Sequence, residues 1–138
     1  MSTPRVGGLL LTATIVELTL ATAIIHASLG GLLFTLNAAG YLVLAAAIVV
    51  SATLPHRLVR RFAWAPRLAL AGFAAATIAG YLAIGPYFML GWATKAIETA
   101  IVLIVVADLV RVHGTAGAIV RAIGGSFKRS GRETMPVR

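Results

Sequence analysis

The chain has 138 residues, of which 59% are hydrophobic and only 12% are charged, and its mean hydropathy is +0.95. Because soluble domains carry about 25% charged residues, this composition excludes an ordinary soluble domain, a disordered tail and a coiled coil, and indicates a small integral membrane protein. The absence of cysteine excludes disulfide frameworks, iron–sulfur clusters and thiol catalysis. The formal net charge is +8, and in a membrane protein its meaning depends on where the charges lie.

A first helical hairpin is predicted from a long charge-free stretch. Residues 18–56 contain no Asp, Glu, Lys or Arg, and one helix of that length would measure roughly 58 Å at 1.5 Å per residue, about twice the hydrocarbon core of a bilayer. The stretch must therefore fold back, and Ser28-Leu29-Gly30-Gly31 is its turn-like cluster. We expect membrane spans near 8–27 and 32–54, with Pro55 ending the second.

A second hairpin is predicted over residues 67–109. Residues 68–94 are again free of charge, and Gly85-Pro86 interrupts them, since proline lacks the backbone donor that a helix needs. We expect spans near 67–84 and 87–109. The predicted fold is therefore all-α: a four-helix transmembrane bundle over residues 1–112, followed by a basic tail over 113–138.

The distribution of Lys and Arg predicts the orientation of the bundle. The N-terminus, the connection between the second and third spans, and the tail carry the basic residues, whereas the connections around Gly30 and Pro86 carry none. Because Lys and Arg are enriched in cytoplasmic flanks of membrane spans, we expect an integral protein of a bacterial plasma membrane with both termini in the cytoplasm. The anionic headgroups of the cytoplasmic leaflet are then its expected lipid partner.

Two further segments are candidates for packing and for lipid contact. Gly72, Ala76 and Gly80 recur at a spacing of four and would form a flat strip for a neighbouring helix, although alanine and glycine are abundant throughout the chain. The tail predicts either a short amphipathic helix on the membrane surface or a solvated segment, and its apolar residues are Ala118, Ile119, Ala122, Ile123 and Phe127. No base-reading motif accompanies the basic charge, so we expect no nucleic-acid partner.

Ionisable residues inside the predicted spans are the candidate functional residues, because each costs roughly 2.5–3.5 kcal/mol at the centre of a membrane helix. Glu17 lies in the first span, and Lys95 and Glu98 lie three residues apart in the fourth, where they can pair. We expect them to form an intramembrane polar cluster with Asn37 of the second span. This cluster would either bind protons or cations or fix the register of the helices. His26, at the outer end of the first span, would contact the cluster, meet an outside ligand or be solvated.

The position of Glu17 is similar to that of the membrane-embedded glutamate in the first of the four helices of the small multidrug resistance transporters. That resemblance implies a dimer in which the glutamate alternately takes protons and cationic drugs. It covers chain size, helix count and Glu17. This chain is longer, carries Lys95 and Glu98 in its last span, and does not match the motif around the family's glutamate.

Two classes of function are open on the sequence. The first is a transporter coupled to protons or cations, which would be oligomeric because four short helices leave little room for a solute path. The second is a non-catalytic accessory or structural subunit of a larger membrane complex. Without a phosphate-binding loop or an HExxH or GxSxG motif, we expect no enzyme, no metal and no cofactor, although His56 and His113 share one predicted side of the membrane, where a bis-histidine haem is conceivable.

Overall fold

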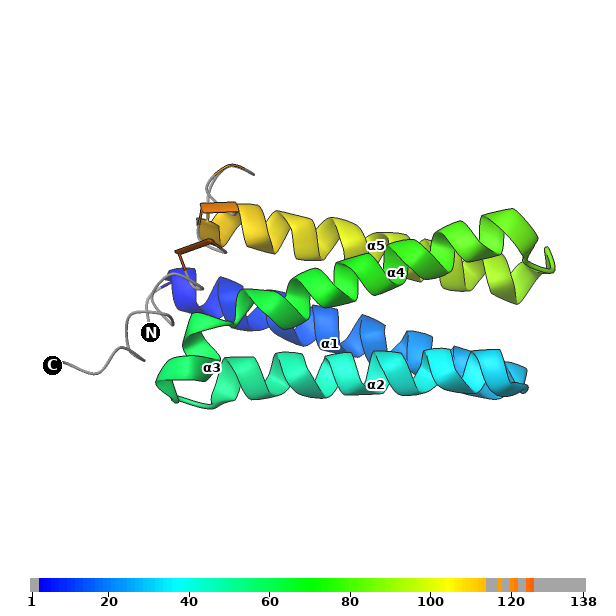
Figure 1. Ribbon diagram of the computed structural model, residues 1–138, viewed down its shortest axis with the longest axis horizontal. Helices are drawn as coiled ribbons and strands as arrows, with labels where there is room; N and C mark the ends of the chain where they lie inside the picture. The colour runs from blue at the N-terminus through cyan, green and yellow to red at the C-terminus, as the bar shows by residue number, and fades with distance from the viewer. Residues whose placement is uncertain (1–2, 114–116, 118–119, 122–123, 126–138) are drawn as a thin grey trace, which may run out of the picture.

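A computed structural model describes residues 3–113 and positions 117, 120–121 and 124–125. The predicted all-α class is confirmed, because these residues form four long helices and one short one, and no strand (Figure 1). In chain order the helices are α1 (Thr3–Leu29), α2 (Leu32–Thr53), α3 (Arg57–Arg61), α4 (Trp64–Ile84) and α5 (Met89–His113). The apolar tail residues of the expected amphipathic helix lie outside the described residues; they are Ala118, Ile119, Ala122, Ile123 and Phe127.

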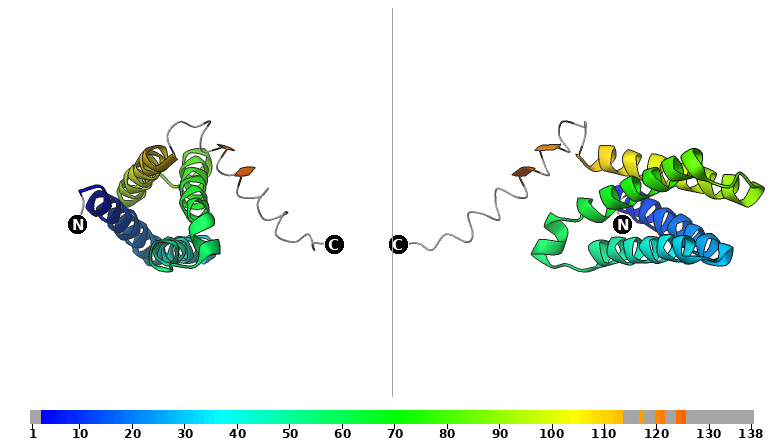
Figure 2. Two further views of the ribbon diagram at one scale, coloured as in Figure 1. Left: turned by 90° about the vertical axis from the view of Figure 1, so that its left-hand side faces the viewer. Right: turned by 45° about the vertical axis from the view of Figure 1, so that its right-hand side comes forward.

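The four long helices run alternately in opposite directions around one core. Each packs against its neighbour along the chain, and α5 also packs against α1, which closes the ring; the left view of Figure 2 looks down this ring. The start of α1, the short helix α3 and the end of α5 lie at one end of the bundle, which we call the arginine end (Figure 1). The connections at residues 30–31 and 85–88 lie at the other, which we call the turn end.

The turns fall where glycine and proline predict them. Gly30 and Gly31 have φ angles of 70° and 84°, which side chains disfavour and glycine accepts. At the other hairpin, the Gly85 amide donates to the Tyr81 carbonyl at 2.8 Å and closes α4. The Phe88 amide then donates to the Tyr81 hydroxyl at 3.3 Å, so α5 begins only at Met89. Both hairpins therefore bring sequence-adjacent helices side by side.

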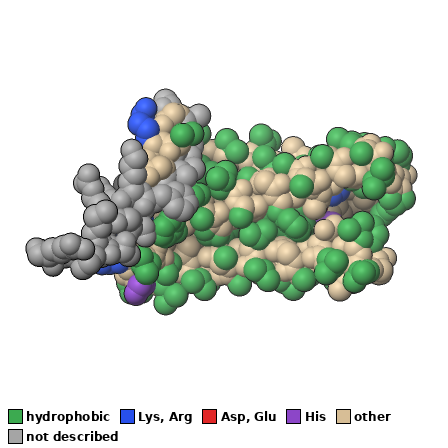
Figure 3. Space-filling view, in the orientation of Figure 1, with side chains coloured by type: hydrophobic (Ala, Val, Ile, Leu, Met, Phe, Trp, Pro, Cys, Tyr) green, Lys and Arg blue, Asp and Glu red, His purple; other side chains and the backbone are tan. Residues whose placement is uncertain are grey.

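Three of the long helices, α1 from Val6 onwards, α2 and α4, are long and apolar enough to cross a membrane. The fourth, α5, has 25 residues and carries Lys95, Glu98, Asp108 and Arg111. Large hydrophobic side chains are exposed along all four helices, and Figure 3 shows them along the visible face of the bundle. The molecule therefore has the surface of a small multi-pass membrane protein.

The interior is formed by a few side chains from each helix, and α4 contributes Leu70, Ala71 and Ala74. The expected packing strip makes no close helix contact within the described residues: Gly72, Ala76 and Gly80 are exposed, and a Cβ added at Gly72 or Gly80 would meet nothing within 4 Å. Ala76 and Gly80 instead line a cavity. Close contacts between helices occur at other glycines: a Cβ would lie 2.6 Å from Cζ of Phe73 at Gly40 of α2, and 2.5 Å from the Tyr81 hydroxyl at Gly91 of α5.

Candidate functional site

Glu98 is the centre of a buried group of polar side chains near the turn end. Its carboxylate has no exposed surface. The Oε2 atom accepts a hydrogen bond from the Lys95 ammonium, one turn earlier on α5, and lies 2.9 Å from the Thr77 hydroxyl of α4. The Oε1 atom faces Nε2 of His26 from α1 at 3.6 Å. The Glu98 carboxylate is thus surrounded by one hydrogen-bonding or charged side chain from each of three helices: Lys95 from α5, Thr77 from α4 and His26 from α1.

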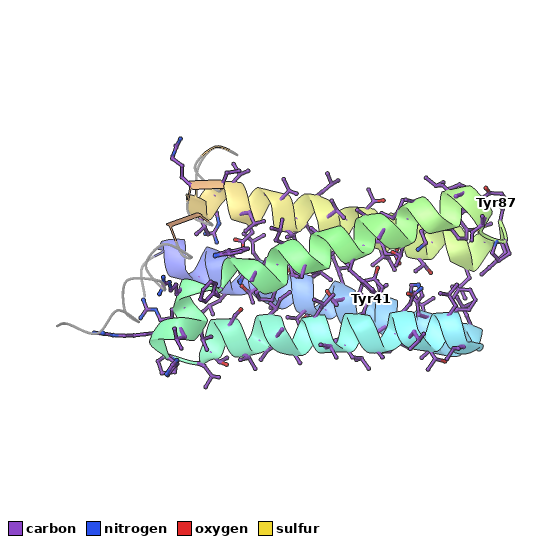
Figure 4. All side chains as sticks on the ribbon, in the orientation of Figure 1. Tyr41 and Tyr87 are labelled. Carbon is purple, nitrogen blue, oxygen red and sulfur yellow. The ribbon has the colours of Figure 1, made fainter. Side chains whose placement is uncertain are left out.

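Helix α2 completes the group through Tyr41. The Tyr41 hydroxyl lies 3.0 Å from Oγ1 of Thr77, so with Thr77 donating to Glu98, Tyr41 donates to Thr77. The Tyr41 ring packs edge-on against Phe73 at 4.9 Å between ring centres and lies 5.5 Å from the ring of His26; Figure 4 labels Tyr41 between α2 and α4. We call His26, Tyr41, Thr77, Lys95 and Glu98 the charge cluster.

The contact of His26 with a backbone carbonyl determines which ring nitrogen carries hydrogen. Its Nδ1 atom lies 2.9 Å from the carbonyl oxygen of Thr22, and because a carbonyl only accepts, Nδ1 carries hydrogen. In a neutral ring, Nε2 is then an acceptor and faces the Glu98 Oε1 atom, which has no hydrogen-bond donor. Two acceptors facing each other in a dry interior are unfavourable. A proton on Nε2 or on Oε1 would remove this conflict.

The charge of the cluster depends on that proton. Lys95 and Glu98 neutralise each other, so with neutral His26 the cluster has no net charge. Adding one proton to either His26 or Glu98 raises the net charge to +1. The charge that the cluster presents to the space beside it therefore differs between these two states.

Such a space is present. A cavity of about 400 Å³ opens beside the charge cluster between the α1–α2 and α4–α5 hairpins. Asn37, Lys95, His26 and Thr77 all line it. The rest of the lining is mainly apolar or aromatic, and the described lining residues include no carboxylate. The Lys95 ammonium also lies 5.5 Å from the centre of the Tyr81 ring, which favours a cation over its face.

Glu17 does not join the charge cluster. It is the middle residue of the candidate span Val6–Leu29, and its side chain is exposed on the outer side of α1. It also precedes His26 by nine residues, which is roughly 13 Å along a helix. The expected meeting of Glu17 with Lys95 and Glu98 is therefore not found, because α1 turns His26 inward, rather than Glu17, at the level of Glu98.

Three members of the charge cluster carry signals that sequence inspection can read. Tyr41 sits inside an apolar span, and a buried tyrosine hydroxyl needs a partner. Thr77 lies in a charge-free span, where a hydroxyl is the strongest available donor. For His26, contact with the polar cluster is one of three alternatives that the sequence leaves open, and the structure shows this contact, with Glu98. Pairing His26 with Glu98 requires knowing that α4 and α5 extend beyond the end of α1, as Figure 1 shows.

A second polar cluster lies at the arginine end. Asp108 of α5 is 3% exposed and accepts from Arg67 Nε at 3.0 Å and from a terminal nitrogen of Arg111 at 2.7 Å. Asp108 and Arg111 are three residues apart on α5, a spacing that brings two side chains to the same face of a helix. Arg67 adds contacts to Thr12 of α1 at 3.2 Å and Ser51 of α2 at 3.5 Å. This one guanidinium therefore links α4 to the three other long helices.

The remaining histidines do not form a site within the described residues. His56 is exposed and caps α3, where its Nδ1 accepts from the Leu58 amide at 3.3 Å. The side chain of His113 lies outside the described part of the chain. No group of three or more His, Asp or Glu side chains suited to a metal ion occurs among the residues that the structure describes.

Comparison of this chain with protein-family models, with curated proteins and with solved structures gives no match.

Proposed function

We propose that the protein is a proton-coupled carrier of a small solute, in which Glu98 and His26 take up and release the proton. The observation that carries this proposal is the buried Oε1 atom of Glu98, which lacks a hydrogen-bond donor and faces His26 Nε2 at 3.6 Å beside a cavity. Ionisable groups inside a membrane protein are costly and are a default sign of function. The role is non-enzymatic, and the proton is the transferred species.

All four long helices cross the bilayer in this proposal, α5 included. Three charged residues of α5 are turned inward, with Lys95 8%, Glu98 0% and Asp108 3% exposed. Its exposed side chains are mainly apolar, among them Leu103, Val106 and Val110, and the exposed Arg111 lies near the end of the helix. The charges are therefore paired inside the bundle, and the surface that α5 presents to lipid is compatible with hydrocarbon.

The arginine end is cytoplasmic in this arrangement. The described arginines of the α2–α4 connection and of the end of α5 lie at the arginine end, whereas the two connections of the turn end carry no charge. Short basic flanks remain in the cytoplasm. Both termini then lie inside, and the charge cluster lies nearer the outer surface.

The chemistry of the cavity indicates the class of solute. Its ionisable lining side chains are His26 and Lys95, so a bound cation meets like charge, whereas a carboxylate or a neutral acceptor is attracted. The aromatic lining residues, which include Phe34, Phe73, Tyr81 and Phe88, favour an apolar body. A small aromatic carboxylate that moves together with a proton fits this lining best, and the cationic drugs implied by the family resemblance fit it poorly.

Proton flux tests the proposal directly. Purified full-length protein is reconstituted into vesicles that contain a pH-sensitive dye, and small aromatic carboxylates and the corresponding amines are added outside. We expect proton movement with carboxylates, and a loss of about tenfold or more in Glu98→Gln, because an amide does not take up a proton. Glu17→Gln makes the same change on the exposed side of α1 and should leave the flux unchanged. Full flux in the Glu98→Gln variant, or none in the wild type across the panel, would contradict the proposal.

One observation favours the second candidate, an accessory or oligomeric subunit. Glu17 is exposed in the middle of a candidate span, where an unpaired carboxylate facing lipid is expensive, so a helix of a partner or of a second copy would supply a donor. The same vesicles distinguish the two functions. If the flux falls in Glu17→Gln but persists in Glu98→Gln, the function belongs to the exposed face of α1 that carries Glu17 and to the helix that covers it.

A further inference from the structure

The arginine end contains a second cavity, of about 530 Å³. All four long helices and α3 contribute to its walls. The charged lining residues are Arg60, Arg61, Arg67, Arg111 and Asp108. The uncharged lining residues include Leu9, Thr12, Ser51, Ala52, Trp64, Leu109 and Val112. The cavity thus combines guanidinium groups with an apolar wall.

The charges of this lining are strongly unbalanced. Four arginines face one aspartate, and four positive charges minus one negative charge leave a surplus of three. Arginine stays charged at every accessible pH, so the surplus is permanent. Both oxygens of Asp108 already accept from Arg67 and Arg111, and Asp108 therefore has little capacity left to neutralise further charge.

Arg67 and Arg111 are held by contacts within the bundle, and the Arg111 side chain is 44% exposed. The Arg67 side chain is 14% exposed, and its nitrogens donate to Asp108, Thr12 and the Ala63 carbonyl. The guanidinium of Arg111 lies over Gly8 of α1, where an added Cβ would stand 3.3 Å from its terminal nitrogen. Fixed guanidinium groups form a preorganised site, which reduces the entropy lost when a ligand binds.

We propose that this cavity binds a phosphate group, either on an anionic phospholipid of the adjacent leaflet or on a free phosphate ester. Guanidinium groups present paired N–H donors that match the oxygens of a phosphate. Basic pockets between membrane helices at the headgroup level suit anionic lipids, and the apolar wall from Leu9, Leu109 and Val112 would contact the first carbons of an acyl chain. The surplus of positive charge attracts an anion, and several guanidinium groups can together donate to more than two oxygens, which a phosphate offers and a carboxylate does not.

Thermal unfolding of the full-length protein in a mild, uncharged detergent tests this site. Phosphatidylglycerol, phosphatidylcholine and inorganic phosphate are titrated separately. We expect phosphatidylglycerol to raise the unfolding temperature by about 5 °C or more, as for a ligand at roughly 100 times its dissociation constant on a domain of this size. Phosphatidylcholine should have a smaller effect, because its choline group is repelled. A shift with phosphatidylglycerol alone assigns the phosphate to lipid, and an equal shift with inorganic phosphate assigns it to a free ester.

A matched pair of variants separates the cavity from general surface charge. Arg60 lines the cavity, whereas Arg57 lies on the same short helix and is not part of the lining; both are exposed. Arg60→Gln and Arg57→Gln remove the same charge. We expect Arg60→Gln to lose at least about half of the phosphatidylglycerol shift and Arg57→Gln to keep it. Equal losses in both variants, or no shift of the wild type with any of the three ligands, would overturn the proposal.

Discussion

Lys95 is held from two sides, by the carboxylate of Glu98 and by the face of the Tyr81 ring. Removing one partner of a buried ion pair leaves the other charge uncompensated. This destabilises a protein far more than replacing both partners by well-packed apolar residues. Glu98 nevertheless has a second basic neighbour in His26. The charged and titratable groups around Glu98 are therefore Lys95 from its own helix, His26 from α1 and Tyr41 from α2, with Thr77 as an uncharged donor from α4.

Lys95→Ala should destabilise the protein. The variant leaves the buried carboxylate of Glu98 without its ammonium, and we expect a loss of about 3–5 kcal/mol. Thermal unfolding in detergent measures this loss.

The double variant Lys95→Ala/Glu98→Gln serves as the control. It removes the stranded carboxylate, and its stability should exceed that of Lys95→Ala. A Lys95→Ala variant as stable as the wild type would contradict the role given to the pair.

At the scale of the helices, the contact between α2 and α4 depends on Gly40. The end of the Phe73 ring occupies the space that a side chain at this position would need, and Phe73 is itself packed edge-on against Tyr41 of the charge cluster. The spacing of small residues on α4 predicts a packing strip at Gly72, Ala76 and Gly80, but these residues are exposed. A single glycine opposite an aromatic ring carries no periodic signal, so this contact was not predictable from spacing.

Gly40→Ala and Gly72→Ala should therefore differ although the chemical change is the same. At Gly40 the new methyl displaces the Phe73 ring, and we expect a loss of about 1–3 kcal/mol from overpacking. At Gly72 the methyl meets nothing within 4 Å, so the effect should be neutral or a gain of up to about 1 kcal/mol from helix propensity. Denaturant unfolding in detergent compares the two. Equal changes in the free energy of unfolding for the two variants would show that the Phe73 ring moves aside without a loss of stability.

The whole molecule is held together by polar contacts at both ends of the ring of helices. At the turn end the charge cluster joins all four long helices, and at the arginine end Arg67 alone does so. Because helix association in lipid lacks the hydrophobic driving force of water, such contacts contribute a larger share of the specificity than they do in a soluble bundle.

Arg67→Ala is expected to cost about 2–4 kcal/mol, since it removes three interhelical contacts and leaves Asp108 with Arg111 as its remaining ion-pair partner. Arg67→Lys should recover less than half of this loss, because one ammonium cannot reproduce the geometry of a guanidinium with several donors. The exposed Arg57→Ala is the control and should change the unfolding temperature little. Full stability of Arg67→Ala would show that Arg67 is not needed to join the helices.

The sequence predicts the class of this fold well and the orientation of its helices poorly. Charge-free stretches interrupted by Gly30-Gly31 and Gly85-Pro86 locate the hairpins, and a spacing of three brings Lys95 to Glu98. Apolar residues surround each span on all sides, so periodicity does not distinguish the inward face from the outward one. For this reason Glu17 was expected inside, and the meeting of His26, Tyr41 and Thr77 at Glu98 was not predicted.

The space between the two polar clusters contains mainly apolar side chains, among them Ile15, Ile48, Leu70, Ile101 and Val105. The hydroxyls of Thr19 and Thr22 at this level donate to carbonyls of their own helix. Glu98 and Asp108 are ten residues, or about 15 Å, apart along α5. If all four long helices cross the bilayer as proposed, this apolar layer would insulate the two clusters from each other, and much of a transmembrane voltage would fall across it. Since 100 mV is worth about 2.3 kcal/mol per elementary charge, voltage would then act mainly on charge that crosses this layer and only weakly on the arrival of a proton at Glu98.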